Sequence, residues 1–291
     1  MTRVHSPLRY PGGKGKLAPY IRAIIAENRL TDGHYAEPYA GGASVGLDLL
    51  FGEYVRYIHI NDLDRSVFAF WHSILNEADT LCALVEHCEL TPAEWRRQRC
   101  IQEEKATADL FSLGFSTFYL NRTSRSGIVS SAGMIGGNDQ SGRWKIDARF
   151  NREELIRRIR RIAEARDRIT LTNLDAVDFL ADLAGTLPER SLTYLDPPYY
   201  VKGQQRLYAS YYKASDHGAI AELLGAFPRC WIVSYDYAPP ILELYQDRRC
   251  IVYDLSYSAA TRHDGAEVMF FSDDLRIPQL AGTVGSAVTA K

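Results

Sequence analysis

The chain contains the stretch His34-Tyr-Ala-Glu-Pro-Tyr-Ala-Gly-Gly-Ala-Ser-Val-Gly46, in which an apolar, strand-like run leads through a glycine-rich turn into a helical pattern. Glycines at such a turn let a ligand approach the backbone closely, and a helix N-terminus offers unpaired N–H groups. Asp62 follows the next apolar run, where an acid can accept hydrogen bonds from a ribose diol. These residues predict a site for a nucleoside-bearing cofactor, either NAD or S-adenosylmethionine.

Similar strand-like runs recur along the chain and alternate with helical patterns. The runs lie at residues 34–39, 55–60, 169–172, 192–195, 230–234, 251–255 and 268–271, and helical patterns lie at 43–51 and 217–224. Such alternation predicts an α/β fold with a parallel sheet, whose strand ends are the usual place for ligands.

The middle of the chain, residues 65–168, has a different pattern. Apolar residues spaced as Val67, Phe70, Trp71 and Ile74 indicate an amphipathic helix. A capping box at 91–94 and an apolar stripe at 155–163 indicate two more helices, and a turn-rich segment at 133–142 suits a hairpin or loop. We therefore expect a mostly helical insertion at 65–168 within a domain formed by 1–64 and 169–291.

Charge is distributed unevenly along the 291 residues. The total is −2, from 34 Lys+Arg and 36 Asp+Glu. Residues 121–168 hold 12 of the basic and 6 of the acidic side chains, which leaves 22 basic and 30 acidic side chains elsewhere. A basic segment within an acidic scaffold indicates contact with nucleic acid. We expect phosphate contacts from Arg143, Lys145 and Arg149, whereas the arginines of 157–161 suit a solvated helix face.

Other features of the composition narrow the class of protein. Apolar residues make up 46% of the chain, but no run of 18 of them occurs, so no membrane span is expected. The first residues lack the apolar core of a signal peptide. Five cysteines without a CxxC spacing favour reduced thiols in the cytoplasm, with neither a disulfide framework nor a zinc site.

The segment Asp196-Pro-Pro-Tyr199 follows the buried run 192–195. Two prolines fix a rigid turn, from which a carboxylate, backbone carbonyls and an aromatic ring project as one unit. This unit suits an exocyclic amino group, which needs acceptors for its hydrogens, and a flat base, which needs an aromatic face. The segment Leu8-Arg-Tyr-Pro-Gly-Gly-Lys14 is not a P-loop, because the first glycine and the final Ser/Thr of that motif are missing.

Taken together, the motifs at 9–14, 37–42, 61–62 and 196–199 resemble, in order and spacing, those of Dam-like (D12 class, α group) adenine-N6 DNA methyltransferases. The resemblance spans residues 7–278. It implies a Rossmann-like methyltransferase core with an inserted target-recognition domain, S-adenosylmethionine as methyl donor, S-adenosylhomocysteine as product, and double-stranded DNA as partner. The predicted reaction requires no metal, and action as a monomer is the default expectation. Restriction–modification, phage and orphan settings all stay open.

The resemblance also implies roles for individual residues. The catalytic set is Asp196, Pro197, Pro198 and Tyr199. The cofactor set is Tyr10, Pro11, Gly12 and Lys14 around the cofactor, Glu37, Ala40 and Gly41 on its methionine side, Asp62 at the ribose and Asp175 at the adenine edge. Asp178 competes with Asp175 for that last role, and both also suit helix capping.

The expected DNA-binding set is Arg9, Asn121, Arg122, Arg125, Arg143, Lys145 and Arg149. Family members of the Dam type follow Leu-Asn-Arg with an aromatic residue and then a base-reading arginine. Here Leu120-Asn-Arg122 is kept, but Arg125 and Ser130 occupy those two positions. The loop is therefore similar in placement but differs in its readout, so the resemblance does not extend to a GATC target. Arg122 suits either a base contact or a structural role that orders the loop.

The predicted reaction is direct methyl transfer to an adenine extruded from the duplex. Tyr199 would stack on the base, while Asp196 and the Pro197 carbonyl would accept the two amino hydrogens. A cytosine-N4 or RNA methyltransferase would reuse the same core. An NAD-dependent oxidoreductase would leave residues 196–199 without a role. A non-catalytic DNA-binding module would need a broken cofactor loop or catalytic motif, and both are intact in this sequence.

Overall fold

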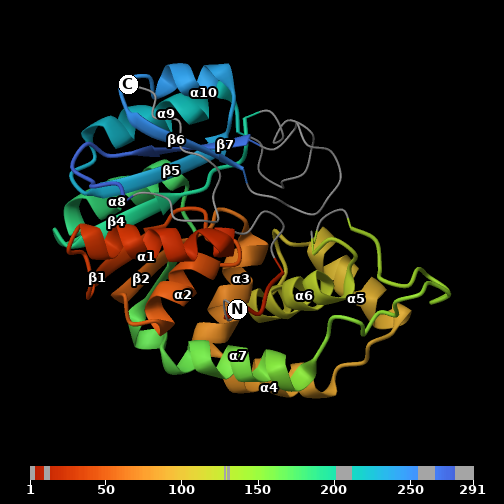
Figure 1. Ribbon diagram of the computed structural model, residues 1–291. Coiled ribbons are helices and arrows are strands. Elements are labelled where there is room, and N and C mark those ends of the chain that lie inside the picture. The colour runs from red at the N-terminus through yellow and green to blue at the C-terminus, as the bar shows by residue number, and fades with distance from the viewer. Residues whose placement is uncertain are drawn as a thin grey trace. The chain divides into compact units, whose positions relative to one another are not determined.

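The computed structural model describes residues 4–9, 14–127, 129, 132–200, 212–254 and 266–278 (Figure 1). Its strands form a seven-stranded sheet in the order β3-β2-β1-β4-β5-β7-β6. The strands are β1 (Gly33–Glu37), β2 (Val55–Asn61), β3 (Ile169–Thr172), β4 (Ser191–Leu195), β5 (Cys230–Asp236), β6 (Arg249–Asp254) and β7 (Ala266–Phe271). The α/β class predicted from the sequence is confirmed.

The sheet is mixed, which differs from the parallel sheet that the sequence predicts. Strands β2, β1, β4 and β5 pair in parallel. Strand β7 pairs antiparallel with both β5 and β6. Antiparallel neighbours need no crossover helix, and within the described residues none lies between β6 and β7. Local strand patterns contain no information on direction, which is why this difference arises.

Helices connect most of the strands. Those in the described residues are α1 (Ala18–Glu27), α2 (Ser44–Phe51), α3 (Arg65–Asn76), α4 (Ala78–His87), α5 (Pro92–Glu103), α6 (Leu110–Thr123), α7 (Arg152–Glu164), α8 (Ala176–Thr186), α9 (Ala214–Ala226) and α10 (Pro239–Leu244), with short 3-10 turns at Lys14–Leu17 and Arg166–Arg168. The N-cap of the predicted capping box is present, because the Thr91 side chain accepts a hydrogen bond from the Glu94 amide at 3.2 Å. The Glu94 carboxylate accepts from the Arg97 and Gln98 side chains. None of these helices is both long and apolar enough to cross a membrane.

The chain divides into two compact units, each made of three segments. The first consists of Met1–Lys16, Ala40–Asp48 and Asp62–Asn173, and the second of Leu17–Tyr39, Leu49–Asn61 and Leu174–Lys291. Every helix from α3 to α7 belongs to the first unit, which includes the whole predicted insertion at 65–168. The assignment of that insertion to target recognition stays a prediction.

In the first unit, the helices pack through aromatic side chains. The rings of Phe70 on α3 and Phe118 on α6 are stacked, with centroids 6.1 Å apart, and Phe150 lies edge-on to Phe118 at 5.5 Å. Gly114 allows this approach, because a Cβ atom there would overlap the Ala69 carbonyl. The pair α3–α6 is therefore a close-packed support for the loops at its ends.

In the second unit, helices α8, α9 and α10 share a hydrophobic core with strands β1, β4, β5, β6 and β7 (Figure 1). Leu180 of α8, Ile220 of α9 and Ile241 of α10 are fully buried in it. Trp231 and Val233 come from β5, and successive side chains of a strand point to opposite faces, so alternate residues of β5 enter this core. The core fixes the carboxyl ends of the parallel strands.

Candidate active site

The turn Asp196-Pro-Pro-Tyr199 begins directly after β4 in the second unit. Since β4 is parallel to β5, Asp196 lies beside Ser234, whose hydroxyl donates a hydrogen bond to Asp196 Oδ1 at 3.1 Å. The Tyr194 hydroxyl is 2.8 Å from the same Ser234 oxygen. Ser234 has a single proton to donate, so Tyr194 donates to Ser234 and Ser234 donates to Asp196.

This donor chain holds the Asp196 carboxylate in one orientation. Burial, followed by the charge of Asp196, raises the pKa of Tyr194 well above its ordinary value, so the phenol stays protonated and donates. Ser234 is fully buried and Tyr194 is 3% exposed. A hydrogen bond to one carboxylate oxygen fixes the rotation of the carboxyl group and thereby the directions of its lone pairs.

The end of the turn is held by two acids that the sequence analysis did not assign a role. The Tyr199 hydroxyl donates to Glu267 Oε1, and the Tyr253 hydroxyl donates to Glu267 Oε2 at 2.9 Å. The amide of Tyr200 donates to Asp236 Oδ1 at 2.8 Å. Both acids are 5% exposed and stand opposite each other in the β5–β7 ladder.

Glu37 ends strand β1, which is parallel to β4 in the same unit. Its carboxylate is 5% exposed and accepts a hydrogen bond from the Tyr35 hydroxyl at 3.0 Å. Burial is the main cause that raises the pKa of Tyr35 well above its ordinary value, and the charge of Glu37 adds to it. Glu37, the last residue of β1, and Asp196, directly after β4, thus lie at the carboxyl ends of neighbouring parallel strands.

In the first unit, the glycine-rich turn has a tight and strained backbone. Gly41 has φ of 47°, a conformation that glycine adopts without steric cost, and Ala43 adopts φ of 44° although it has a Cβ atom. The Trp71 indole N–H donates to the Gly41 carbonyl at 2.9 Å and fixes the turn to α3. Strain at a non-glycine residue is common where a loop serves a ligand.

Asp62 is tied to the same turn. Its Oδ2 accepts from the Gly41 amide at 2.9 Å, and its Oδ1 accepts from the Asp64 amide at 2.9 Å. Burial of the carboxyl raises the pKa of Asp62 to about 7, although part of the side chain stays accessible. Each oxygen of a carboxylate has two lone-pair sites, so a second hydrogen bond at each fits the two hydroxyls of a ribose.

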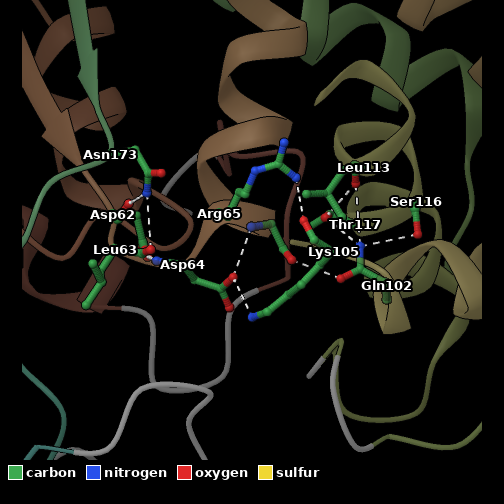
Figure 2. Close-up of polar contacts among 11 residues, drawn as sticks. Asp62, Leu63, Asp64, Arg65, Gln102, Lys105, Leu113, Ser116, Thr117 and Asn173 are labelled. Carbon is green, nitrogen blue, oxygen red and sulfur yellow. Dashed lines mark hydrogen bonds and ion pairs between the residues drawn. The ribbon is translucent and has the colours of Figure 1, made fainter. Parts of the chain in front are cut away.

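Figure 2 shows how the turn after β2 is fastened to the helices of the first unit. The side-chain amide of Asn173 donates to the Asp62 carbonyl at 2.7 Å and to the Leu63 carbonyl at 3.1 Å. The Lys105 ammonium lies 3.2 Å from Asp64 Oδ1. The Arg65 guanidinium donates to the Lys105 carbonyl. These contacts hold the Asp62 backbone, and none of them could be anticipated from local sequence.

The comparison with family models identifies the chain. The model of the D12 class N6 adenine-specific DNA methyltransferase matches residues 10–259. The chain belongs to this family. It is therefore an adenine-specific DNA methyltransferase that depends on S-adenosylmethionine, as the motifs predicted.

None of the curated proteins compared with this methyltransferase matches. Among solved structures, it is similar to the crystal structure of protein LPL1258 from Legionella pneumophila str. Philadelphia 1, with 13% identity and a TM-score of 0.33 over 90% of this chain and 86% of that one.

The remaining predicted cofactor residues of the methyltransferase have different positions. Tyr10, Pro11 and Gly12 lie outside the described residues. Lys14 begins a 3-10 turn and is 4% exposed. Asp175 caps α8 by accepting from the Val177 amide at 2.9 Å. Capping uses one lone pair of the Asp175 carboxylate, so its predicted contact with the cofactor adenine stays a prediction.

Three of the predicted DNA-binding residues, Arg9, Asn121 and Arg122, are at least partly buried and form internal contacts in the first unit. Asn121 accepts from the Arg9 amide and donates to the Arg9 and Gly127 carbonyls, at 2.8, 2.8 and 2.7 Å. The Arg9 guanidinium donates to carbonyls at the end of α6 and just beyond it. Arg122 is 8% exposed, and its guanidinium donates to the Pro7 carbonyl. These contacts favour the structural interpretation of Arg122 that the sequence left open.

The other four, namely Arg125, Arg143, Lys145 and Arg149, are exposed around the turn-rich segment, and we name the described residues of 125–149 the basic loop. Arg125, Lys145 and Arg149 also donate to carbonyls within this loop. Ser130 lies outside the described residues. The loop also exposes 64% of Trp144, against whose ring the Arg143 guanidinium packs at 5.3 Å. Trp144 is not among the residues predicted from the sequence, although a tryptophan in a polar, turn-rich stretch can indicate a contact surface. Within the described residues, no group of three or more His, Cys, Asp or Glu side chains is arranged to hold a metal ion.

Proposed function

We propose that the enzyme methylates N6 of an adenine that is flipped out of double-stranded DNA. The observation that carries the proposal is the Asp196 carboxylate, fixed by Ser234 at the start of a Pro-Pro turn. An amino group stacked inside a duplex cannot reach such a carboxylate, so the base has to leave the stack.

Asp196 accepts a hydrogen bond from one amino hydrogen of the target adenine, and the Pro197 carbonyl accepts from the other. This arrangement directs the nitrogen lone pair toward the methyl donor. The carboxylate charge also stabilises the positive charge that develops on N6 during transfer, and it does so without reorganisation because Ser234 already holds it. The Tyr199 ring supplies the face on which the base stacks.

S-adenosylmethionine, when bound, supplies an electrophilic methyl group. Asp62 fits its ribose because the two backbone N–H donors leave lone pairs on both carboxylate oxygens. Glu37, Ala40 and Gly41 are proposed at its methionine side. Arg125, Arg143, Lys145 and Arg149 are proposed to contact phosphates or bases of the DNA. Action as a monomer and a cytoplasmic location stay predictions.

The decisive variant is Asp196→Ala. We expect it to lose methyl transfer to unmethylated genomic DNA while its dissociation constant for S-adenosylmethionine stays close to that of the wild type. Asp182→Ala is the matched control, since Asp182 is an exposed acid on α8. Turnover by Asp196→Ala at the rate of the control would refute the proposed role.

The product is tested in a host that lacks adenine methylation. After expression of the wild-type enzyme, sequencing of modified bases reports the methylated base, its position and the surrounding motif together. We expect N6-methyladenine in a defined motif. N4-methylcytosine or an unmodified genome would contradict the proposal.

A further inference from the structure

Glu267 lies near the start of β7, the strand between β5 and β6. It stands opposite Asp236 on one side and Tyr253 on the other. Its side chain is 5% exposed. Burying a carboxylate costs free energy unless hydrogen-bond donors of the protein replace water. The donors around Glu267 therefore explain how the fold accommodates an acid at this position.

Two phenols supply such donors. Tyr253 donates to Oε2 at 2.9 Å, and Tyr199 donates to Oε1. Burial, with the charges of Asp196 and Glu267, raises the pKa of Tyr199 well above its ordinary value. A raised pKa favours the protonated phenol, which matches the direction of the bond from Tyr199 to Glu267.

The hydrogen bond to Glu267 fixes the ring of Tyr199, and the backbone next to Tyr199 is also held. The amide after Tyr199, that of Tyr200, donates to Asp236 at 2.8 Å, and two prolines precede Tyr199. Asp236 and Glu267 are partners in the ladder, so a single position of the sheet holds both the backbone and the hydroxyl of the turn. A tyrosine side chain turns about two bonds, and fixing both its ends leaves the ring one orientation.

We propose that Glu267 is a positioning residue for methyl transfer: it accepts the hydrogen bond of Tyr199 and thereby holds that ring in the orientation in which it stacks on the target adenine. The inference rests on the proposed role of Tyr199 as the stacking residue. Glu267 itself does not touch the base or the methyl donor; it acts through the phenol.

The test compares Tyr199→Phe, Glu267→Ala and the double variant. The measurements are the single-turnover rate on unmethylated genomic DNA with saturating S-adenosylmethionine, the dissociation constant for that cofactor, and the midpoint of thermal unfolding. Losing a hydrogen bond to a buried carboxylate should slow transfer about tenfold in each single variant, with cofactor affinity unchanged. The double variant should be no slower than Glu267→Ala, because both changes remove the same contact.

Two variants separate positioning from a merely structural role. Tyr253→Phe is the matched control: it removes the other phenol from the same carboxylate and should lower the unfolding midpoint as Tyr199→Phe does, with a rate within about threefold of wild type. Glu267→Gln should recover most of the rate, since an amide can accept from one hydroxyl and donate to the other. Equal slowing by both Phe variants would overturn the inference.

Tyr199→Ala distinguishes this inference from the proposed function. Full activity of Tyr199→Ala would remove the stacking role on which the inference rests. Loss of activity in Tyr199→Ala, together with wild-type rates in Tyr199→Phe and Glu267→Ala, would overturn the role of Glu267 alone. If Glu267→Ala does not fold, the rate of Tyr199→Phe decides the question, because that variant retains the acid.

Discussion

The backbone N–H of Gly41 donates a hydrogen bond to Asp62 Oδ2 at 2.9 Å, so the glycine turn and the acid after β2 form one rigid group. The second oxygen is held in the same way by the Asp64 amide. Backbone donors hold the carboxylate in place before any cofactor arrives, which lowers the entropic cost of binding. The ionisation state of Asp62 then controls how well it accepts further hydrogen bonds.

Cofactor affinity should depend on pH through Asp62. Burial raises the pKa of this carboxyl to about 7, so it is ionised above that pH and protonated below it. Protonation removes the negative charge and one acceptor site, and the dissociation constant for S-adenosylmethionine should rise by about tenfold per pH unit below about 7. Calorimetric titration across this range measures the effect.

Asp62→Asn serves as the reference for that experiment. It keeps the shape of the side chain and does not titrate, so it should bind more weakly and show only the pH dependence of the cofactor itself. Parallel pH profiles for the wild type and Asp62→Asn would contradict a role for Asp62 as the ribose acceptor.

A histidine pair on β1 and β2 should make the fold sensitive to acid. His34 Nδ1 and His59 Nε2 are 2.9 Å apart. Burial lowers the pKa of His34, and burial followed by the charge of His34 lowers the pKa of His59 to about 4, so folding disfavours protonation of the pair. Unfolded histidines bind protons near pH 6.5, so the stability of the pair is fully present above that pH and is lost as the pH falls toward about 4.

The measurement is the free energy of unfolding in urea at pH 7 and pH 5. We expect the wild type to lose about 1 kcal/mol between these values because of the pair, after allowance for partial exposure. The variant His59→Gln should lose less. The exposed residue His87 provides the control, and His87→Gln should behave as the wild type. An unchanged acid response in His59→Gln would contradict this account.

The basic loop should determine the salt dependence of DNA binding. Removing one phosphate contact reduces the slope of log affinity against log salt concentration by about 1. We expect this change for Arg143→Ala and Lys145→Ala. Arg157→Ala is the control, because Arg157 is paired with Glu154 on α7 at 2.6 Å. Filter binding from low to high salt measures the slopes, and equal slopes for all three variants would exclude the loop as the phosphate-contacting surface.

Arg122 should contribute to stability rather than to DNA contact. Its buried guanidinium donates to the Pro7 carbonyl, and burial lowers the pKa of this guanidinium to about 10. Arg122→Ala should lower the free energy of unfolding by about 2–4 kcal/mol, since a charged hydrogen bond and the packing of a long side chain are lost. Chemical denaturation measures this loss. A stable Arg122→Ala that binds DNA weakly would favour the base contact instead.

Local patterns in the sequence predicted much of the fold and of the candidate site. The strand runs, the helix at Arg65–Asn76 and the Thr91 cap follow from periodicity and capping chemistry, which act over a few residues. The turns at Gly41 and Asp196 are also predicted from local sequence, because in each case glycines or prolines directly follow an apolar strand-like run. Their predicted roles in catalysis and cofactor binding await the experiments above.

Contacts between distant residues could not be predicted in this way. Glu267 reaches Tyr199 because β7 runs antiparallel between β5 and β6, and no local period encodes that direction. The hydrogen bonds between the Asn121 side chain and the backbone of Arg9, 112 residues away, are a second example, and the predicted DNA contact of Asn121 stays a prediction. Such pairs become visible only when the tertiary structure brings the segments together.

The basic loop encodes its shape and its surface in different residues. The Gln140 side chain donates to the Ile135 and Gly137 carbonyls, at 2.9 and 2.7 Å, and accepts from the Ile146 amide at 2.9 Å. Arg143 and Trp144 stand exposed on the loop that this amide holds. Point mutations at those two positions can therefore alter what the surface contacts while the loop keeps its conformation. New target sequences could then evolve without an initial loss of stability.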